Sequence, residues 1–467
     1  MFSMKKIKIA YIGGGSKEWA RVFMSDLTLT ADLSGDIFLY DIDTEAALRN
    51  KAIGEALNKH PNAKTSWNYT VETSLEKTLT KADFVIISIL PGTFSEMESD
   101  VHEPEKYGIF QSVGDTVGPG GVLRAMRTVP LYEEFAKNIK KYCPKAWVLN
   151  LTNPMSICVK TLYDVFPEIK AFGCCHEVFH TQDLLCCVLK EELGIEATRK
   201  EITTSISGIN HFTWITSASY KDKDLLPLFE QFMQKHYKEG FYEGGEKNLY
   251  KTNPFAYGNR VKMHLYQTYK TLPTGGDRHI VEFLNKNWYL SSPATVDFWH
   301  FALTTVAYRK EKQAEKIADS LAMAQGKKPV VLEKSQEEVV DLMQALLGMK
   351  ELISNVNIPN YGQMQEFPLG SIVETNAFFH YDEIIPLHAN PLPLGPRSLV
   401  TRNLQNSETL YQGIKKRDFQ IIFQSFMNQP LCSELTIEEG KTLFIKMVQN
   451  TKHYLEDFYN LDILTSL

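Results

Sequence analysis

The chain has 467 residues, of which 43% are hydrophobic and 23% are charged, and its formal net charge is −6. This is the composition of a globular protein. A chain of this length is longer than one hydrophobic core ordinarily accommodates, so we expect two domains. The acidic balance offers no basic surplus for nucleic acid. No stretch approaches the roughly 20 apolar residues that a membrane span needs. We therefore expect neither nucleic-acid nor membrane binding.

The first residues and the cysteines both bear on the compartment. The start, MFSMKKIKIAYIGGGS, places lysines before a short apolar run that ends in glycines, which predicts a first strand and not a signal peptide. The chain has seven cysteines, an odd number, and four of them stand as two pairs of sequence neighbours. Such a set makes a poor disulfide framework. A reducing cytoplasm is predicted, with most thiols acting as small buried hydrophobic groups.

The N-terminal run, KIKIAYIGGGS, is the first sign of a nucleotide site. Gly13, Gly14 and Gly15 would let the backbone turn tightly and approach a pyrophosphate. Ser16 is expected to open a helix whose N-terminus would face that group. The next apolar run ends at Asp41, where a carboxylate can accept hydrogen bonds from an adenosine ribose. A glycine turn alone is weak evidence, because many such turns exist for geometry only.

The units that follow strengthen this interpretation. KADFVIISI and AWVLNLTNP are apolar runs typical of buried parallel strands, and each ends in polar or turn-forming residues. Strands that alternate with helices predict an α/β fold, namely a Rossmann-like doubly wound sheet with its ligand at the carboxyl ends of the strands. We expect this domain to occupy residues 1–195, and a mixed α+β domain to occupy residues 196–467.

Helical periodicity in the second half predicts helices over residues 311–325 and 440–464, with an exposed loop at 325–329. In the first half, the glycine-rich stretch 111–121 leads into a helix that carries Arg124 and Arg127. It could be a flexible connection with two solvated arginines. It could also be a lid over cofactor and substrate, with backbone amides and an arginine aimed at anionic groups.

The stretch GCCHEVFHTQD contains a literal H-E-x-x-H formed by His176, Glu177 and His180. On a helix these residues could hold zinc as in a metallopeptidase. Zinc peptidases place the motif inside a long helix, whereas His176 follows a β-rich run, and no third ligand occurs at a typical distance. We therefore interpret Glu177 and His180 as first-turn residues of the following helix.

A different pair of metal ligands is suggested by two predicted strands. IKAFGCC would deliver Cys175 to the ligand-binding edge of the sheet, and GINHFTW offers His211 in another short apolar stretch. A thiolate and an imidazole would form a half-site open to substrate oxygens, which suits a metal acting as a Lewis acid. Asn153, just past another strand end, is either a turn residue before Pro154 or a ligand contact, and the two roles are compatible.

Several motifs, taken together and in order, resemble those of glycoside hydrolase family four, the NAD- and divalent-metal-dependent glycosidases. They are KIAYIGGGS, DTVGPGG, NLTNP, GCCHE and GINHFTW. SVGDTVGPGG, GCCHEVF, GINHFTWIT and GDRHIVEFL make the sequence most similar to the α-galacturonidases of that family. The resemblance extends to NVNIPNYGQ and IVETNAF in the second half. It implies a fold of the lactate/malate dehydrogenase type and commonly a homodimer or homotetramer.

The resemblance also implies roles for individual residues. Cys175 and His211 would ligate Mn²⁺ or another divalent metal, and Asn153 would contact substrate hydroxyls near it. His176 would lie near the departing oxygen as a candidate acid. For the base, which varies among subgroups, GGDRH makes Asp277 our candidate.

In the same segment His279 is the runner-up for the base and, with Arg278, a candidate substrate contact. A galacturonide needs a partner for its carboxylate, which Arg278 or an arginine of the glycine-rich stretch could supply by a bidentate contact.

The family's mechanism, as the resemblance implies it, explains a nicotinamide in a hydrolase. NAD⁺ oxidises carbon three of the sugar, the metal polarises the resulting carbonyl, and a base removes the proton on carbon two. The glycosidic oxygen then leaves by elimination, water adds and hydride returns. The alternatives are an α-glucosidase, α-galactosidase or α-glucuronidase of the same family, a 2-hydroxy-acid dehydrogenase, or a nucleotide-sensing protein without enzymatic activity.

Overall fold

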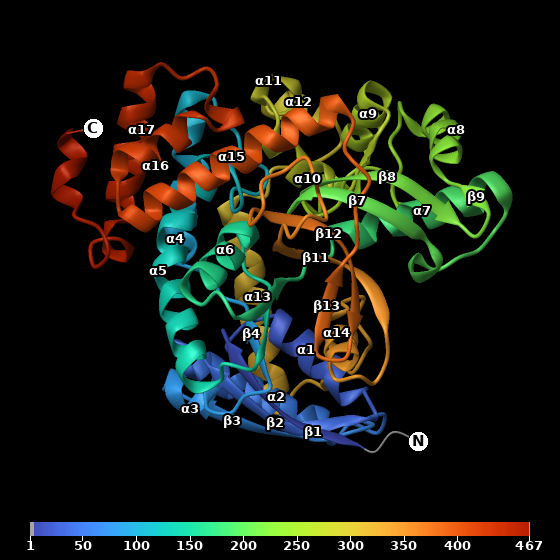
Figure 1. Cartoon of the computed structure of the whole chain (residues 1–467), viewed down its shortest axis with the longest axis vertical. Helices are drawn as coiled ribbons and strands as arrows, with labels where there is room; N and C mark the ends of the chain where they lie inside the picture. Colours follow the sequence, from blue (N-terminus) through green and yellow to red (C-terminus); the bar gives the residue numbers. More distant parts are fainter. Residues whose placement is uncertain (1–3, 467) are drawn as a thin grey trace.

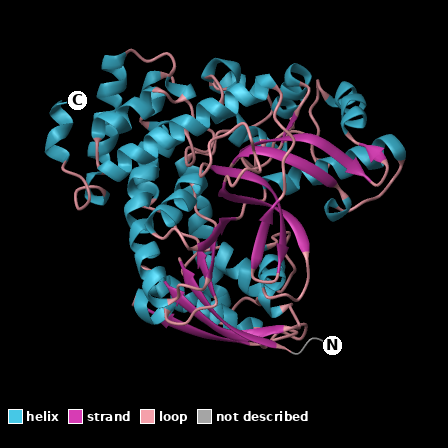
Figure 2. Ribbon diagram, viewed as in Figure 1, coloured by secondary structure: helices cyan, strands magenta, loops and turns pink. Residues whose placement is uncertain are grey.

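The computed structural model describes residues 4–466. Within that range the strands join into one 13-stranded sheet in the order β10-β8-β7-β12-β11-β6-β5-β4-β1-β2-β3, with β13 paired to β12 and β9 to β8. Figure 2 shows the strands as one strongly twisted band with helices along its sides. No helix in this part of the chain is both long enough and apolar enough to cross a bilayer.

The strands have the following bounds: β1 Lys5–Ile12, β2 Leu33–Tyr40, β3 Trp67–Glu72, β4 Phe84–Ile87, β5 Trp147–Asn150, β6 Lys170–Gly173, β7 Thr203–Ile209, β8 Phe212–Tyr220, β9 Lys223–Asp224, β10 Leu272–Pro273, β11 Leu352–Pro359, β12 Ile372–His380 and β13 Glu383–Pro386. The α-helices have these bounds: α1 Trp19–Thr28, α2 Thr44–Leu57, α3 Leu75–Leu79, α4 Phe94–His102, α5 Gly118–Tyr142, α6 Met155–Val165, α7 Glu177–Leu193, α8 Leu226–His236, α9 Arg260–Tyr269, α10 Asp277–Ile280, α11 Lys286–Tyr289, α12 Pro293–Phe298, α13 Val306–Ala324, α14 Val339–Leu346, α15 Leu394–Lys416, α16 Phe419–Met427 and α17 Ile437–Asn450.

The first half is the predicted doubly wound sheet. Strands β3, β2, β1, β4, β5 and β6 lie in that order and every pair is parallel. Along β1, Ile9 and Tyr11 pack into one apolar cluster, whereas Ala10 and Ile12 pack into another on the opposite face. Since successive side chains of a strand point to opposite faces, the part of a strand that helices cover on both sides must be apolar, as residues 9–12 of β1 are.

The second half continues the same sheet with antiparallel strands. β11 joins the edge of the parallel part through Asn357 opposite Gly173, and β12, β7, β8 and β10 follow. A large apolar cluster packs α15, α16 and α17 against α5, which stands upright beside them in Figure 1. The predicted Rossmann-like sheet followed by mixed α and β elements is confirmed. The boundary at residue 195 stays a prediction, and α7 ends two residues before it, at Leu193.

Two helix boundaries differ from prediction. Helix α1 begins at Trp19 and not at Ser16, because the Ser16 amide donates to the Gly13 carbonyl (2.9 Å) and closes a turn first. The helix expected over 440–464 ends at Asn450 and gives way to short 3-10 turns. There the Thr451 hydroxyl donates to the Met447 carbonyl (3.2 Å), a local side-chain bond that competes with helix continuation. Helix α13 contains residues 311–324 of the other predicted helix, and 325–329 form the predicted loop.

Candidate active site

The glycine turn after β1 is built for close approach of a ligand. Gly13 has φ +94°, and a Cβ there would lie 1.9 Å from the Ser88 carbonyl oxygen, so a side chain cannot be accommodated. The two oxygens of Asp41 accept hydrogen bonds from the amides of Gly15 (2.8 Å) and Asp43 (2.9 Å). A carboxylate has about four lone-pair sites, so Asp41 is fixed at the end of β2 and can still accept further bonds. These residues fit a dinucleotide.

The glycine-rich stretch before α5 is held to the protein by its own amides. Val113 N (2.7 Å) and Gly114 N (3.0 Å) donate to Glu282, and Gly118 N donates to the Gln429 side chain (2.9 Å). Burial raises the pKa of Glu282 to about 7. These amides are therefore occupied, and the proposed lid with amides free for a ligand does not describe this stretch.

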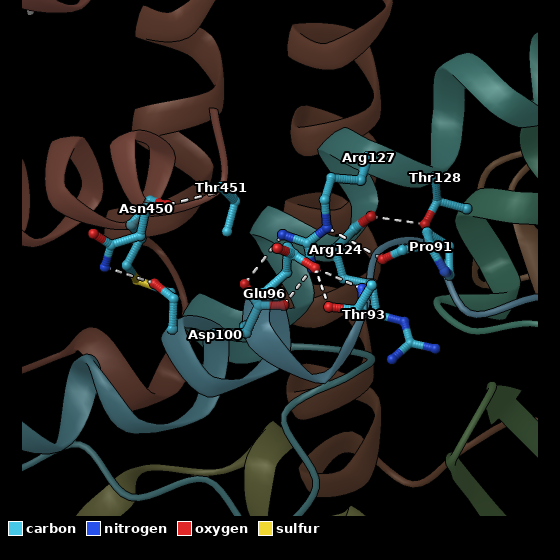
Figure 3. A network of polar contacts seen from close by, with 12 residues as sticks. Pro91, Thr93, Glu96, Asp100, Arg124, Arg127, Thr128, Asn450 and Thr451 are labelled. Carbon is cyan, nitrogen blue, oxygen red and sulfur yellow. Dashed lines mark hydrogen bonds and ion pairs between the residues drawn. The ribbon is translucent and has the colours of Figure 1, made fainter. Parts of the chain in front are cut away.

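The two arginines of α5 differ in their surroundings. Arg127 is buried and pairs with Asp100 of α4, and its Nε donates to the Pro91 carbonyl (3.2 Å) after β4, as Figure 3 shows. It is neither solvated nor available to a ligand. Within residues 4–466, Arg124 donates through Nε alone, to the Asn153 carbonyl (3.1 Å). Arg124 thereby ties the start of α5 to the loop after β5.

The predicted metal ligands are placed by two different kinds of turn. Cys175 follows β6 and is buried, and Asn355 of β11 donates to its carbonyl (2.9 Å). His211 is the second residue of the tight turn between β7 and β8, with φ +63° and a buried side chain. The pKa of His211 is lowered to about 3 by burial and by neighbouring His279, so the imidazole is neutral, as a metal ligand must be.

Further observations test whether this place fits a divalent metal. Burial, with Glu374 and Glu177 nearby, raises the pKa of the Cys175 thiol well above its usual value, and a cation would reverse that effect. The Oδ1 atoms of Asn153 and Asn210 are buried without a hydrogen-bond partner. Across residues 4–466, no group of three or more His, Cys, Asp or Glu side chains could hold a metal. A thiol, an imidazole and spare amide oxygens fit an open site better than a closed cage.

The GGDRH segment places its two acid–base candidates differently. The Asp277 carboxylate is buried and accepts hydrogen bonds from the amides of Val261 (3.2 Å) and Lys262 (3.1 Å) at the start of α9, and burial raises its pKa to about 6. The His279 ring lies 4.2 Å from the His211 ring between centroids. His279 is thus next to a predicted metal ligand, whereas Asp277 caps a helix.

The two histidines of the H-E-x-x-H motif lie side by side, with ring centroids 5.2 Å apart, but Glu177 contacts other residues. His176 precedes α7 and is partly exposed, with its ring 5.7 Å from Trp19 and Nδ1 3.6 Å from Glu337, and His180 is exposed. Glu177 lies in the first helical turn as expected, but it is buried. It accepts a hydrogen bond from the Gly276 amide and lies 3.1 Å from His279 Nδ1. Burial would raise the pKa of Glu177, but His279 and His211 lower it well below the usual range.

Sequence reasoning did not single out four residues around this site. Thr116 Oγ1 lies 3.3 Å from His211 Nδ1 and can set its tautomer. The Tyr257 ring covers Gly276, where a Cβ would approach it to 2.8 Å, and the fully buried Lys262 donates to Thr181 (2.7 Å). Arg309, at the start of α13, donates to the Val113 carbonyl (3.2 Å). Thr116 lies within the motif DTVGPGG, which could have pointed to it, whereas Tyr257, Lys262 and Arg309 belong to no motif that the sequence analysis identified.

The fold and the candidate site together fit one class, namely enzymes with a dinucleotide-binding sheet and a metal site at the carboxyl ends of its strands. Profiles of the family 4 glycosyl hydrolases and of their C-terminal domain match residues 8–191 and 206–432. The chain belongs to glycosyl hydrolase family 4, which confirms the resemblance and makes it a glycosidase.

Individual relatives match over nearly their full length. The α-galacturonidase of Thermoanaerobacter italicus is 49% identical over 450 residues, which cover 96% of this chain and 97% of the relative. That of Bacillus subtilis is 46% identical over 448 residues, covering 96% and 98%. The crystal structure of a Bacillus subtilis glucosidase has a TM-score of 0.89 at 44% identity and covers 95% of this chain and 99% of its own.

A more distant solved structure shares the fold. It is a 6-phospho-α-glucosidase from gut microorganisms in complex with NAD and Mn²⁺, with a TM-score of 0.81 at 17% identity, covering 96% and 99% of the two chains.

Proposed function

We propose that this glycosidase hydrolyses α-galacturonides, in particular α-1,4-linked oligomers of galacturonate. The observation that carries the proposal is the identity of 46–49% over nearly the whole chain to relatives named α-galacturonidase. By comparison, the α-galactosidase of Bacillus subtilis is 27% identical over 443 residues. The acidic sugar is thus favoured over the neutral one.

NAD and Mn²⁺, or another divalent metal, are the proposed cofactors. Support comes from the Gly13 turn and Asp41, which fit a dinucleotide, from Cys175 and His211, which fit a metal, and from the related structure that holds both groups. When bound, they would supply a hydride acceptor for carbon three and a positive charge at its oxygen, which acidifies the proton on carbon two.

The chain's own residues would bind the sugar and move protons. Asn153 has a buried Oδ1 without a partner, which can accept from a sugar hydroxyl. His176 would protonate the departing glycosidic oxygen. For the carbon-two proton, the hydrogen bonds that occupy the Asp277 carboxylate support His279 in its place, because His279 contacts Glu177 through Nδ1 and keeps Nε2 for substrate.

The proposal also covers the domain organisation, the oligomeric state and the cellular compartment. Residues 1–195 would hold NAD, and residues 196–467 would complete the substrate and metal site and supply the contacts of a homodimer or homotetramer. Seven free cysteines support a reducing cytoplasm.

Digalacturonate incubated with the protein, NAD⁺, Mn²⁺ and a thiol reductant tests the proposal. We expect release of galacturonate without accumulation of NADH, because the hydride returns to the sugar. Stoichiometric NADH would instead identify a dehydrogenase. Turnover of neutral α-glucosides or α-galactosides, with none of digalacturonate, would contradict the substrate. Activity that survives removal of both NAD⁺ and metal would contradict the mechanism.

A further inference from the structure

Three arginines from distant parts of the sequence gather around the segment 112–117. They are Arg124 of α5, Arg278 of α10 and Arg309 of α13. Each lies close enough to lower or raise the pKa of Asp115 or of one another. Burial would raise the pKa of Asp115, but Arg124, His279 and His211 lower it well below the usual range. The cluster is therefore contiguous with the predicted metal side of the site.

Thr304 organises two of these arginines as a pair. Arg278 Nη1 donates to the Thr304 hydroxyl (2.8 Å), and Arg309 Nε donates to the Thr304 carbonyl (3.5 Å). The Thr304 amide in turn donates to the Ser112 carbonyl (3.0 Å), and Arg309 Nη2 donates to the Val113 carbonyl (3.2 Å). The Arg278 guanidinium also lies 4.6 Å over the Phe255 ring. Both guanidinium groups are thus fixed in place.

The three arginines share this cluster with three carboxylates, of which Glu282, with its pKa raised to about 7, is only partly ionised at neutral pH. Asp115 accepts from the Thr116 hydroxyl (2.7 Å), Glu282 accepts from backbone amides, and Glu177 contacts His279. None of them forms an ion pair with the three arginines, and neither does any other acidic group of residues 4–466. Burial, with Arg278 and Arg124 nearby, lowers the pKa of Arg309 to about 10. The Arg278 guanidinium is buried and forms no ion pair with residues 4–466, which is costly unless an anion joins it.

Donor groups remain for such an anion. Arg309 Nη1 and the Nε and Nη2 atoms of Arg278 donate to no group in the part of the chain that the structure describes. A planar guanidinium edge with two free N–H groups matches the two oxygens of a carboxylate. The pyrophosphate-binding turn at Gly13 belongs to another strand end, whereas this cluster adjoins His211 and His279.

We propose that Arg309 and Arg278 together bind the carboxylate of the acidic sugar, and that Arg309 is a specificity-determining residue of the enzyme. The inference rests on the proposed function. It goes beyond that function because it assigns recognition of the substrate carboxylate to Arg309, a residue that lies outside every motif of the sequence. Arg309 is a binding residue in this account and takes no part in proton or hydride transfer.

The test compares Arg309→Gln and Arg309→Lys with wild type, each with NAD⁺ and Mn²⁺ bound. Lys310→Met is the matched control, because Lys310 is the next residue of α13 but pairs with Glu98 on the surface (2.9 Å). We expect R309Q to lower kcat/KM for digalacturonate, and the affinity for galacturonate, at least about a hundredfold. R309K keeps the charge without the fork and should fall in between, K310M should match wild type, and NAD⁺ affinity should be unchanged in all three.

The outcomes separate three failures. If wild type prefers digalacturonate and R309Q binds galacturonate within threefold of wild type, the Arg309 proposal is wrong while the function stands. If NAD⁺ affinity falls in parallel with galacturonate affinity, the anion belongs to the cofactor and the proposal is also wrong. If wild type itself does not act on digalacturonate, the proposed function fails first. If thermal denaturation shows that R309Q is not folded, the same affinity thresholds are applied to R309K instead.

Discussion

The proposed chemistry depends most on Cys175 and on the amide oxygens of Asn153 and Asn210. Buried polar atoms without partners are uncommon in folded proteins, yet Asn153 and Asn210 both keep one near the turn that carries His211. Each such atom costs stability in the free protein. The two unpaired oxygens are explained if each one coordinates a metal ion or accepts a hydrogen bond from a sugar hydroxyl when these groups bind.

Cys175→Ser tests the metal ligand at this scale. A serine hydroxyl is a much poorer ligand than a thiolate, so Mn²⁺ affinity should fall at least about tenfold to a hundredfold, and activity with it. Electron paramagnetic resonance of free Mn²⁺ measures the first quantity without reference to turnover. The neighbouring Cys174→Ser is the control and should bind Mn²⁺ as wild type does. Equal Mn²⁺ affinity in all three proteins would remove Cys175 from the site.

At the scale of elements, buried charged side chains hold neighbouring helices and the glycine-rich stretch in place. Glu282 ties down residues 112–114, and Arg127 joins α5 to α4 and to the turn after β4. Glu96 and Thr93 close the start of α4 by a reciprocal capping box, visible beside that ion pair in Figure 3. The C-terminal α17 is tied to the same place by Asn450, whose side chain donates to Ser99 (2.9 Å).

Glu282→Gln tests the fastening of the glycine-rich stretch through pH. The pKa of Glu282 rises from 4.5 to about 7 on folding, so its stabilising contribution is complete below pH 4.5 and is lost as pH rises through about 7. The loss amounts to roughly 3 kcal/mol at about 1.4 kcal/mol per pKa unit. Glutamine can still accept the two amide hydrogen bonds. The Tm of E282Q should therefore exceed that of wild type at pH 8, and the difference should shrink toward pH 5. A difference independent of pH would refute this assignment.

Asp100→Ala tests the buried ion pair. Removing one partner leaves Arg127 charged and buried, which costs about 3–5 kcal/mol, so the variant should unfold several degrees earlier in thermal denaturation. Glu98→Ala on the same helix is the control. Its pair with Lys310 is exposed and should contribute less than about 1 kcal/mol. Comparable loss in the two variants would show that burial of the Asp100–Arg127 pair carries no special weight.

At the scale of the whole molecule, short-range patterns predicted more than long-range pairings did. Apolar runs such as KADFVIISI located β4, and the order of strand and helix was enough for the parallel sheet. The addition of β11 to the edge of β6 could not be read from periodicity, because the pairing brings Asn357 to Gly173 across a long stretch of chain. No spacing rule links residues so far apart.

Among the site residues, too, some positions could be predicted from short-range patterns and others could not. Cys175, His211 and Asp41 each follow a predicted strand or lie in its turn, so their positions at the sheet edge could be anticipated. The contact of Glu177 with His279, and the pairing of Arg278 and Arg309 through Thr304, depend on how the second half folds back onto the first. The family resemblance made Asp277 the candidate base, whereas the α9 amides at its carboxylate and the contact of His279 with Glu177 favour His279.

The central claim is that a glycosidic bond is cleaved here after temporary oxidation of the sugar, at a site that joins both halves of the molecule. Hydrolysis of digalacturonate in D₂O with NAD⁺ and Mn²⁺, followed by mass spectrometry and NMR of the product, tests it most directly. Galacturonate formed from the non-reducing residue should carry one deuterium on carbon two, because that proton is removed and replaced from solvent. Full cleavage with only hydrogen at carbon two would contradict the account.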